Sequence, residues 1–439
     1  MREDRAINWS HDLLLPTALF AVLGAMSWAV RGCSGYGAMM GCIFAGVLWG
    51  TAWWFMARDP SGTQSRRYTS GWIILALTFG IGISGARGWA QWPNFFEGHL
   101  QTNASTGAFV PISPAYGFLW LFIAGVPWAG IGACMLAWCG PARRLAWWAW
   151  PIRIACGIGG AWLAGYAFNH FPEYFLPLYK SMKAQYLDIE TNPNLRRLTN
   201  DSRSAITHLG MYLGFLLFEA GRRDWKNVTL ISCVGLVNGV GWALLQNWAW
   251  AADLWPGVQF NWWRCWESSG GISIGIAYGL AYFLVNRKTA PVDEAEHALR
   301  RNGRPNLERF GVYFGLLLGL GLSIRNGLKG WANIYLGNEE YWSGVFWNIV
   351  GPVMLAGMVA IPIMIWMRRL PKDYAGDVFP HAYRLMWLAL IVQNILAQLV
   401  TGPLSNRNEQ IFSAYYLMLL AVSGWILHGV HRAKRDGWA

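Results

Sequence analysis

Long apolar stretches alternate with short polar segments along the whole chain. An α-helix of about 20 mostly apolar residues is long enough to cross the hydrocarbon core of a bilayer. Two stretches, 206–220 and 310–325, give the weakest signal because they are short. The pattern predicts an all-α integral membrane protein with about twelve transmembrane helices, at 13–31, 35–57, 71–87, 116–139, 147–168, 206–220, 227–248, 268–286, 310–325, 342–367, 385–402 and 411–428.

Lysine and arginine are concentrated in alternate polar segments, which predicts how the helices are oriented. Basic residues favour the cytoplasmic side of a membrane. Segments 88–115 and 249–263 contain neither Lys nor Arg, so we expect them outside. Both termini fall on the basic side, which predicts cytoplasmic ends and a bacterial inner membrane. The basic segments include Arg58, Arg66 and Arg67, Arg222, Arg223 and Lys226, Arg368 and Arg369, and Arg432, Lys434 and Arg435.

Segment 169–205 fits this alternation badly. It should lie outside, yet it contains Lys180, Lys183, Arg196, Arg197 and Arg203. The charge rule weakens for long loops. Either the segment includes an amphipathic helix lying on the membrane, or it is cytoplasmic and the fifth stretch is re-entrant.

Composition agrees with a membrane protein and argues against other classes. Charged residues make up 13% of the chain, against about 25% in a soluble protein. The chain has 51 glycines, which allow membrane helices to pack closely. It also has 30 tryptophans, which are enriched where the apolar core of a membrane meets the headgroups. The net charge of +12 is explained by topology, so we expect the lipid bilayer and a small solute as partners and no nucleic acid. Association with further copies or with a membrane complex stays open. No metal-ligand or nucleotide motif occurs, so no cofactor is predicted.

Glycine patterns suggest an internal repeat. Gly37 and Gly41 in the second stretch match Gly271 and Gly275 in the eighth at one constant offset. The end of the third stretch, Ser84 to Gly88, also resembles the end of the ninth, Ser323 to Gly327. We therefore predict two parallel six-helix halves, 1–220 and 221–439, a layout found among secondary transporters. The alternative is chance resemblance between glycine-rich helices. Glycines four apart, as at 271, 275 and 279, share one helix face and predict a packing seam.

Ionisable residues inside membrane helices are costly and often functional. Arg31, Arg87 and Arg325 are each followed at once or closely by glycine, at the predicted outer end of an odd-numbered helix. The planar guanidinium suits a carboxylate or phosphate. Together these arginines would form a basic vestibule for an anion. The alternative for each is a contact with lipid headgroups or a structural carboxylate.

The segment Asn261–Gly271 combines aromatic rings, a cation, a carboxylate and glycines. Trp266 could stack on a sugar ring or a cation. Glu267 is a candidate partner for Arg87 or Arg325, or a carrier of a proton. The alternative is an interfacial tryptophan belt with a local pair between Arg264 and Glu267.

Three amides complete the predicted substrate site. Asn394 and Gln398 are four residues apart and therefore share one helix face. Asn238 occupies the seventh stretch. Such amides either bond to neighbouring helices or line a wet cavity.

The leading hypothesis is a secondary transporter of a small polar anion, such as a sugar acid, with no catalytic residues. The first alternative is a membrane-embedded enzyme acting on a lipid-linked glycan or phospholipid at the outer face. A second is a non-catalytic subunit of a membrane complex. A deep cavity at the bilayer midplane favours transport, and a groove open sideways to lipid near the outer leaflet favours the enzyme. The enzyme hypothesis depends on the outer residues Glu97, His99, Glu173, Glu339 and Glu340.

Overall fold

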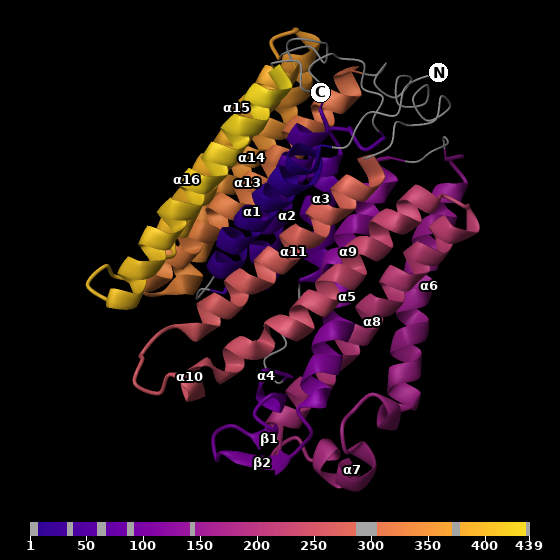
Figure 1. Ribbon diagram of the computed structural model, residues 1–439, viewed down its shortest axis with the longest axis vertical. Coiled ribbons are helices and arrows are strands. Elements are labelled where there is room, and N and C mark those ends of the chain that lie inside the picture. Colours follow the sequence, from indigo (N-terminus) through magenta and orange to yellow (C-terminus); the bar gives the residue numbers. More distant parts are fainter. Residues whose placement is uncertain are drawn as a thin grey trace.

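The protein is a bundle of long helices that run roughly side by side (Figure 1). The computed structural model describes residues 8–32, 38–58, 67–85, 92–140, 145–286, 305–370 and 378–435. The long helices are α1 (Leu15–Arg31), α2 (Ala38–Ala57), α3 (Ile73–Ser84), α5 (Ala115–Trp138), α6 (Ala149–His170), α8 (Pro193–Gly221), α9 (Trp225–Leu244), α11 (Trp262–Asn286), α13 (Pro305–Tyr335), α14 (Glu339–Trp366), α15 (Val378–Leu399) and α16 (Arg407–Arg435). Shorter elements are a π-helical turn (Ser10–Leu14), α4 (Trp92–Phe95), β1 (His99–Asn103), β2 (Ala108–Pro111), α7 (Tyr179–Leu187), α10 (Ala251–Leu254) and the 3-10 turns Pro172–Tyr174 and Leu245–Trp250.

Each predicted apolar stretch overlaps one of these long helices. Within the described residues, 9 helices are long and apolar enough to cross a membrane, and α3 is a shorter apolar helix. The chain is therefore a polytopic all-α membrane protein, as predicted. Helices α6 and α8 fall outside that group of nine, so the count of about twelve crossings stays a prediction.

The most extensive helix contacts form a central bundle flanked on two sides. Helix α1 packs mainly on α11, α5 on α9, and α2 on α3. Helices α6 and α8 pair with each other on one side, while α13 to α16 cover the other (Figure 1). The α1–α11 and α5–α9 pairs each join helices from either side of residue 220. The two predicted halves thus share one core, and the repeat itself stays a prediction.

Glycines allow the backbones of α1 and α11 to touch. A methyl group added to Gly24 would lie 2.0 Å from the carbonyl oxygen of Gly271. One added to Gly275 would lie 2.3 Å from that of Phe20, and one added to Gly279 would meet Thr17 at 2.5 Å. Gly271, Gly275 and Gly279 therefore form a packing seam, as predicted, whereas Gly37 lies outside the described residues.

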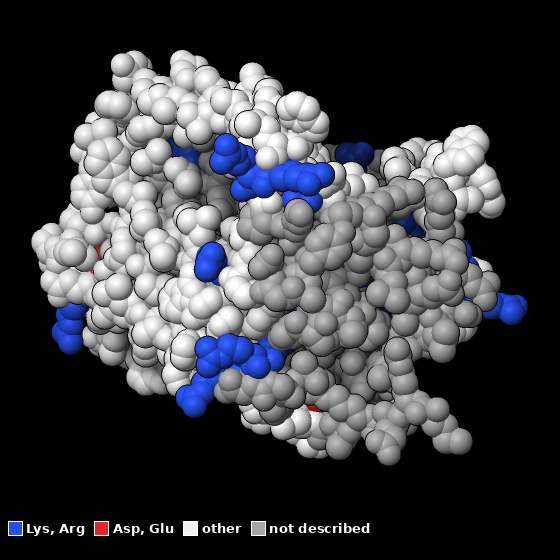
Figure 2. Space-filling model, turned by 90° about the horizontal axis from the view of Figure 1, so that it is seen from above, with Lys and Arg blue, Asp and Glu red and all other residues white. Residues whose placement is uncertain are grey.

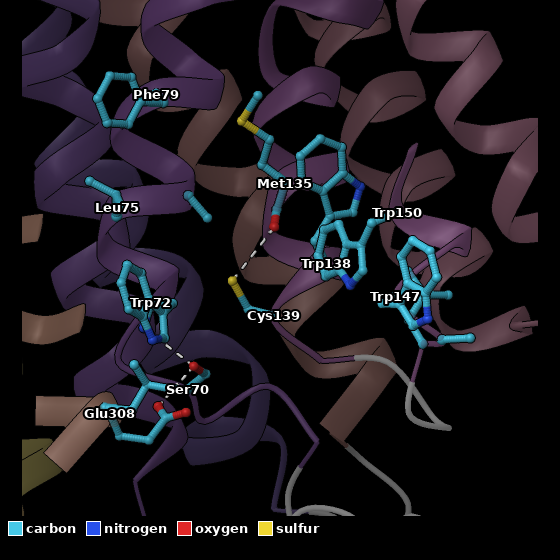
Figure 3. A pocket seen from close by; sticks show the side chains of 14 residues that line it. Ser70, Trp72, Leu75, Phe79, Met135, Trp138, Cys139, Trp147, Trp150 and Glu308 are labelled. Carbon is cyan, nitrogen blue, oxygen red and sulfur yellow. Dashed lines mark hydrogen bonds between the residues drawn. The ribbon is translucent and has the colours of Figure 1, made fainter. Parts of the chain in front are cut away.

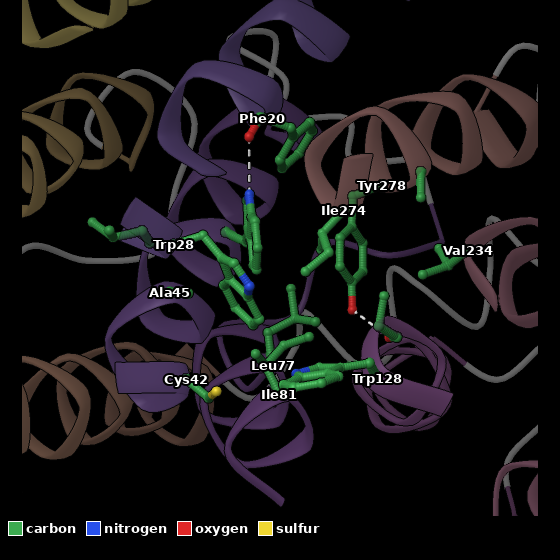
Figure 4. Packing of buried hydrophobic residues seen from close by; sticks show 14 of the residues in the cluster. Phe20, Trp28, Cys42, Ala45, Leu77, Ile81, Trp128, Val234, Ile274 and Tyr278 are labelled. Atoms are coloured by element: carbon green, nitrogen blue, oxygen red, sulfur yellow. Dashed lines mark hydrogen bonds between the residues drawn. The ribbon is translucent and has the colours of Figure 1, made fainter. Parts of the chain in front are cut away.

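Large aromatic side chains fill the space around this seam. The indole nitrogen of Trp49 donates to the carbonyl oxygen of Phe20 at 2.9 Å, which ties α2 to α1. The hydroxyl of Tyr278 on α11 donates to the carbonyl oxygen of Ala129 on α5 at 2.9 Å. Figure 4 shows these rings packed with aliphatic side chains of α3. Trp49 and Tyr278 thus fill the core and each bonds to the backbone of a neighbouring helix.

The first and last described helices meet at one end of the bundle, called the terminal end below. Trp9 packs on Phe283 with ring centroids 5.5 Å apart. Lys434 donates to the carbonyl oxygens of Met56 and Arg58. Lys and Arg side chains gather at several places on this face (Figure 2). A shared end for Trp9 and Lys434 agrees with an even number of crossings between them, while the cytoplasmic assignment stays a prediction.

The opposite end, called the hairpin end, carries the antiparallel strands β1 and β2. Asn103 of β1 donates to the carbonyl oxygen of Thr191 at 3.1 Å. The side chain of Asn194 donates to that of Gln101 at 3.0 Å. Segment 169–205 therefore begins at the same end as 88–115, and α6 is one unbroken helix between the two ends rather than a re-entrant one.

Several helices extend beyond the predicted stretches. Helix α13 continues ten residues past Arg325 to Tyr335, so this arginine does not lie at a helix end. The polar residues there suggested a loop, but two of them bond to the neighbouring helix α14. Arg325 bonds to Ser343, and Lys329 pairs with Glu339. Helix α11 likewise begins at Trp262, because the aromatic and charged residues that follow pack inward.

Candidate functional site

Arg31 and Glu267 form an ion pair inside the bundle. Arg31 is the last residue of α1, and one of its terminal nitrogens, Nη1, lies 3.0 Å from each carboxylate oxygen of Glu267 in α11. Their side chains are 6% and 2% exposed. A Cβ on Gly32 would lie 2.6 Å from Cγ of Glu267, so glycine makes the approach possible. Removing two charges from water is costly, which makes this pair a functional candidate.

Cys42 of α2 joins the pair. The Nε–H of Arg31 points at its sulfur at 3.2 Å, and the thiol points at the carbonyl oxygen of Gly85 at 3.5 Å. Through these contacts the guanidinium connects α1, α2, α11 and the end of α3. The guanidinium thus contacts α2 and α11 directly, and Cys42 extends the contact to the end of α3.

Indole rings enclose the guanidinium. Its central carbon lies 5.2 Å from the ring of Trp28 and 5.1 Å from that of Trp128, within cation–π range. Trp128 stacks on Trp242 with centroids 5.3 Å apart, and Trp242 meets the edge of Trp266 at 5.2 Å. All of these rings are buried, so the site is closed in this structure.

The cage also holds a buried N–H donor. The Nε1–H of Trp28 is buried and has no hydrogen-bond acceptor among the described residues. A buried donor without a partner costs free energy, and such groups call for an explanation. Here it lies on the same helix as Arg31, one turn away, where both could face one anion.

Asn238 forms a separate buried polar contact between helices. Its amide nitrogen donates to the carbonyl oxygen of Gly125 at 2.7 Å, and its oxygen accepts from Ser273 at 3.2 Å. It thereby joins α9, α5 and α11. The structure thus brings together three residues that the sequence predicted for a site, Arg31, Trp266 and Glu267, and places Asn238 on α9, one turn before Trp242.

The other predicted site residues lie elsewhere. Arg325 bonds to the backbone oxygen of Ser343 at 3.1 Å and lies 5.7 Å from the ring of Trp347. It belongs to the contact between α13 and α14, so it does not join Arg31 in a vestibule. Arg87 lies outside the described residues.

Asn394 and Gln398 do share one face, and they line a separate pocket of about 340 Å³ between α13 and α15. Gln398 also bonds to Ser413 of α16. The pocket has aromatic walls formed by Trp331 and Tyr335. Both amides therefore line this pocket, and Gln398 also joins α15 to α16. Neither belongs to the site around the ion pair.

Two of the partners considered for Glu267 were wrong, and the third, Arg87, lies outside the described residues. Glu267 binds Arg31 rather than Arg325, and the alternative of a local pair with Arg264 also fails, because Arg264 pairs with Glu409 at 2.6 Å. Sequence reasoning also missed Cys42, Trp128 and Trp242. Trp28 had a signal, since a residue three positions before Arg31 lies on the same helix face. Cys42, Trp128 and Trp242 belong to other helices, and no sequence pattern pointed to them.

A second set of buried charges lies at the terminal end. Arg153 of α6 pairs with Glu219 of α8 at 2.5 Å, and both are fully buried. The same carboxylate accepts from Asn227 at 2.8 Å and from Arg222 at 3.3 Å. Asn227 in turn accepts from Tyr68 at 2.7 Å. This terminal network also includes the ion pair between Arg67 and Asp224.

The residues proposed for an outer-face enzyme belong to different elements. Glu97 and His99 are 3.9 Å apart and half exposed on the hairpin end. Glu339 instead pairs with Lys329 at the start of α14. Among the described residues, no group of three His, Cys, Asp or Glu side chains is placed to hold a metal ion.

Fold and site together define a polytopic helical membrane protein with a closed, charged site in its core. No protein-family model matches the chain, and neither a characterised protein nor a solved structure matches it significantly. Any assignment of function therefore depends on the geometry of the site.

Proposed function

We propose that the protein is a proton-coupled secondary transporter of a small organic anion in a bacterial inner membrane. One observation supports this proposal above all: the Arg31 guanidinium already binds a carboxylate. Its Nη1 lies 3.0 Å from each carboxylate oxygen of Glu267. A guanidinium binds carboxylates well, and this one already holds a carboxylate supplied by the protein. Glu267 therefore stands where the carboxylate of a solute would stand.

Proton coupling follows from competition for one cation. When Glu267 is ionised, it neutralises Arg31 and leaves no charge for an incoming anion. When a proton from water binds Glu267, its negative charge is lost and Arg31 becomes available. One proton and one anionic charge then enter the site together. The buried Nε1–H of Trp28 and the indole faces would complete the contacts with the solute.

The test is uptake by sealed proteoliposomes that contain this chain alone. Labelled sugar acids and neutral sugars are offered with and without an inward proton gradient. We expect saturable uptake of acids that the gradient accelerates. Arg31→Gln should abolish it, because the cation is lost. Glu267→Gln should keep anion exchange but remove the effect of the gradient.

The matched control is Arg196→Gln, which removes an exposed arginine at the hairpin end. This variant should transport like wild type. Failure of the folded wild-type protein to take up any solute would contradict the proposal, as would normal gradient-driven uptake by Arg31→Gln. In the second case the pair would be structural.

A further inference from the structure

A groove of about 900 Å³ opens at the terminal end between α3, α5, α6 and α13. Figure 3 shows its two walls, with Leu75 and Phe79 on α3 facing Met135 and Trp138 on α5. Its rim is open to the surroundings, because Phe79 is 40% exposed and Trp147 is 83% exposed. Since α5 and α13 are long and apolar enough to cross a membrane, the rim is placed to meet lipid.

The groove ends in a carboxylate. One oxygen of Glu308, Oε2, accepts from the hydroxyl of Ser70 at 2.8 Å and from the backbone nitrogen of Gly71 at 2.7 Å. These bonds fix the side chain at the start of α13, beside the indole of Trp72 (Figure 3). Glu308 is only 4% exposed. No Lys, Arg or His among the described residues pairs with it.

A buried carboxylate without a cation is costly unless a ligand supplies the charge. The two donors at Oε2 are neutral, so they orient the carboxylate without neutralising it, and the described part of the chain supplies no cation for it. The adjacent walls are apolar and open toward the acyl chains of the bilayer. The ligand that fits is an amphiphile with an N–H-bearing ammonium group and a long hydrocarbon chain.

We propose that this groove binds a phosphatidylethanolamine molecule from the bilayer. Its ammonium group donates to Glu308, and one acyl chain lies between Leu75 and Met135. Its phosphate lies at the terminal end, a face on which Lys and Arg side chains gather (Figure 2). Phosphatidylcholine lacks the N–H donors, and phosphatidylglycerol lacks the cation. This inference is independent of the proposed transport activity.

The experiment measures which lipid stays with the protein. Purified full-length chain is exchanged into nanodiscs with equal amounts of the three phospholipids and matched acyl chains. After extraction into mild detergent, retained lipid is counted by native mass spectrometry. We expect about one phosphatidylethanolamine per chain, retained about tenfold or more above the other two lipids, as a charge-assisted hydrogen bond implies.

Two variants and a control sharpen the result. Glu308→Gln keeps an oxygen for Ser70 and Gly71 but loses the charge, so the preference should disappear. Ala76→Phe fills the groove, so all three lipids should be lost from it. Glu190→Gln removes an exposed carboxylate at the other end and should change nothing. Equal retention of the three lipids by wild type, preference for phosphatidylglycerol, or unchanged phosphatidylethanolamine in Ala76→Phe would overturn the proposal.

Discussion

The two buried arginine–carboxylate sites differ in how many hydrogen-bonding partners the carboxylate has. In the terminal network, the Glu219 carboxylate is shared by Arg153, Arg222 and Asn227. In the core, Glu267 has one hydrogen-bonding partner among the described residues, Arg31. Shared charges hold α6, α8 and α9 together redundantly. A carboxylate that has a single hydrogen-bonding partner is either paired or released. That behaviour suits a site that changes state.

The largest effect should come from removing the shared carboxylate. Glu219→Leu leaves the fully buried Arg153 without its counter-charge and also frees Arg222 and Asn227. Breaking one buried pair costs about 3–5 kcal/mol, and we expect the free energy of unfolding to fall by at least that much. Unfolding by SDS in mixed micelles measures it. A smaller loss than for Glu267→Leu would contradict the distinction between the two sites.

A double substitution tests whether the core pair is self-contained. Arg31→Met alone should reduce the free energy of unfolding by about 3–5 kcal/mol, because Glu267 remains buried and unpaired. Arg31→Met with Glu267→Leu should recover most of that stability while uptake stays lost. The equivalent double substitution of Arg153 and Glu219 should recover much less, since Arg222 and Asn227 remain. Equal recovery at both sites would show that they do not differ.

The seam beneath the core pair should respond less strongly. Gly271→Ala places a methyl group 2.0 Å from the carbonyl oxygen of Gly24, so α1 and α11 must separate. Overpacking of this kind costs about 1–3 kcal/mol. Gly159→Ala in α6 is the matched control, because nothing lies within 4 Å of its added methyl. Thermal unfolding in detergent compares the two variants, and equal midpoints would refute the seam's role.

We expect the smallest effect from an exposed carboxylate that belongs to neither buried site. Hydrogen bonds from the Thr191 side chain and backbone lower the pKa of Asp188, between α7 and α8, below its ordinary value. Its contribution to stability is therefore complete above the unfolded pKa of about 3.9 and is lost as pH falls through the lower folded pKa. Hydrogen exchange in 186–193 should rise only in that acidic range. Asp188→Asn should remove this pH dependence.

The class of fold was predictable because hydropathy reports directly on membrane crossing. All of the apolar stretches proved to be helices, and the weak ninth one was misjudged only in length. Its continuation through Gly327 and Lys329 depends on contacts with α14 that a local pattern does not contain. Boundaries therefore failed where polar residues are satisfied by a neighbouring helix.

The site was predictable in its members but not in its pairing. Intramembrane charge identified Arg31 and Glu267 separately, since such residues are rare in apolar helices. Their meeting depends on α1 packing against α11, and α2, α3 and α5 are apolar on nearly every face, so periodicity does not reveal which helices adjoin. The same reason hid Trp128 and Trp242. In the glycines of α11, by contrast, spacing alone identified the face that packs.

The pairing of α1 with α11 also determines when the molecule can be completed during synthesis. Arg31 and Glu267 are separated by 236 positions along the chain. At about 5–20 residues per second, roughly 10–50 s pass between the emergence of the first charge from the ribosome and that of the second. During this interval α1 is in the membrane without the helix that neutralises it. The arginine at its very end can meanwhile remain among lipid headgroups, and it enters the bundle when its partner arrives.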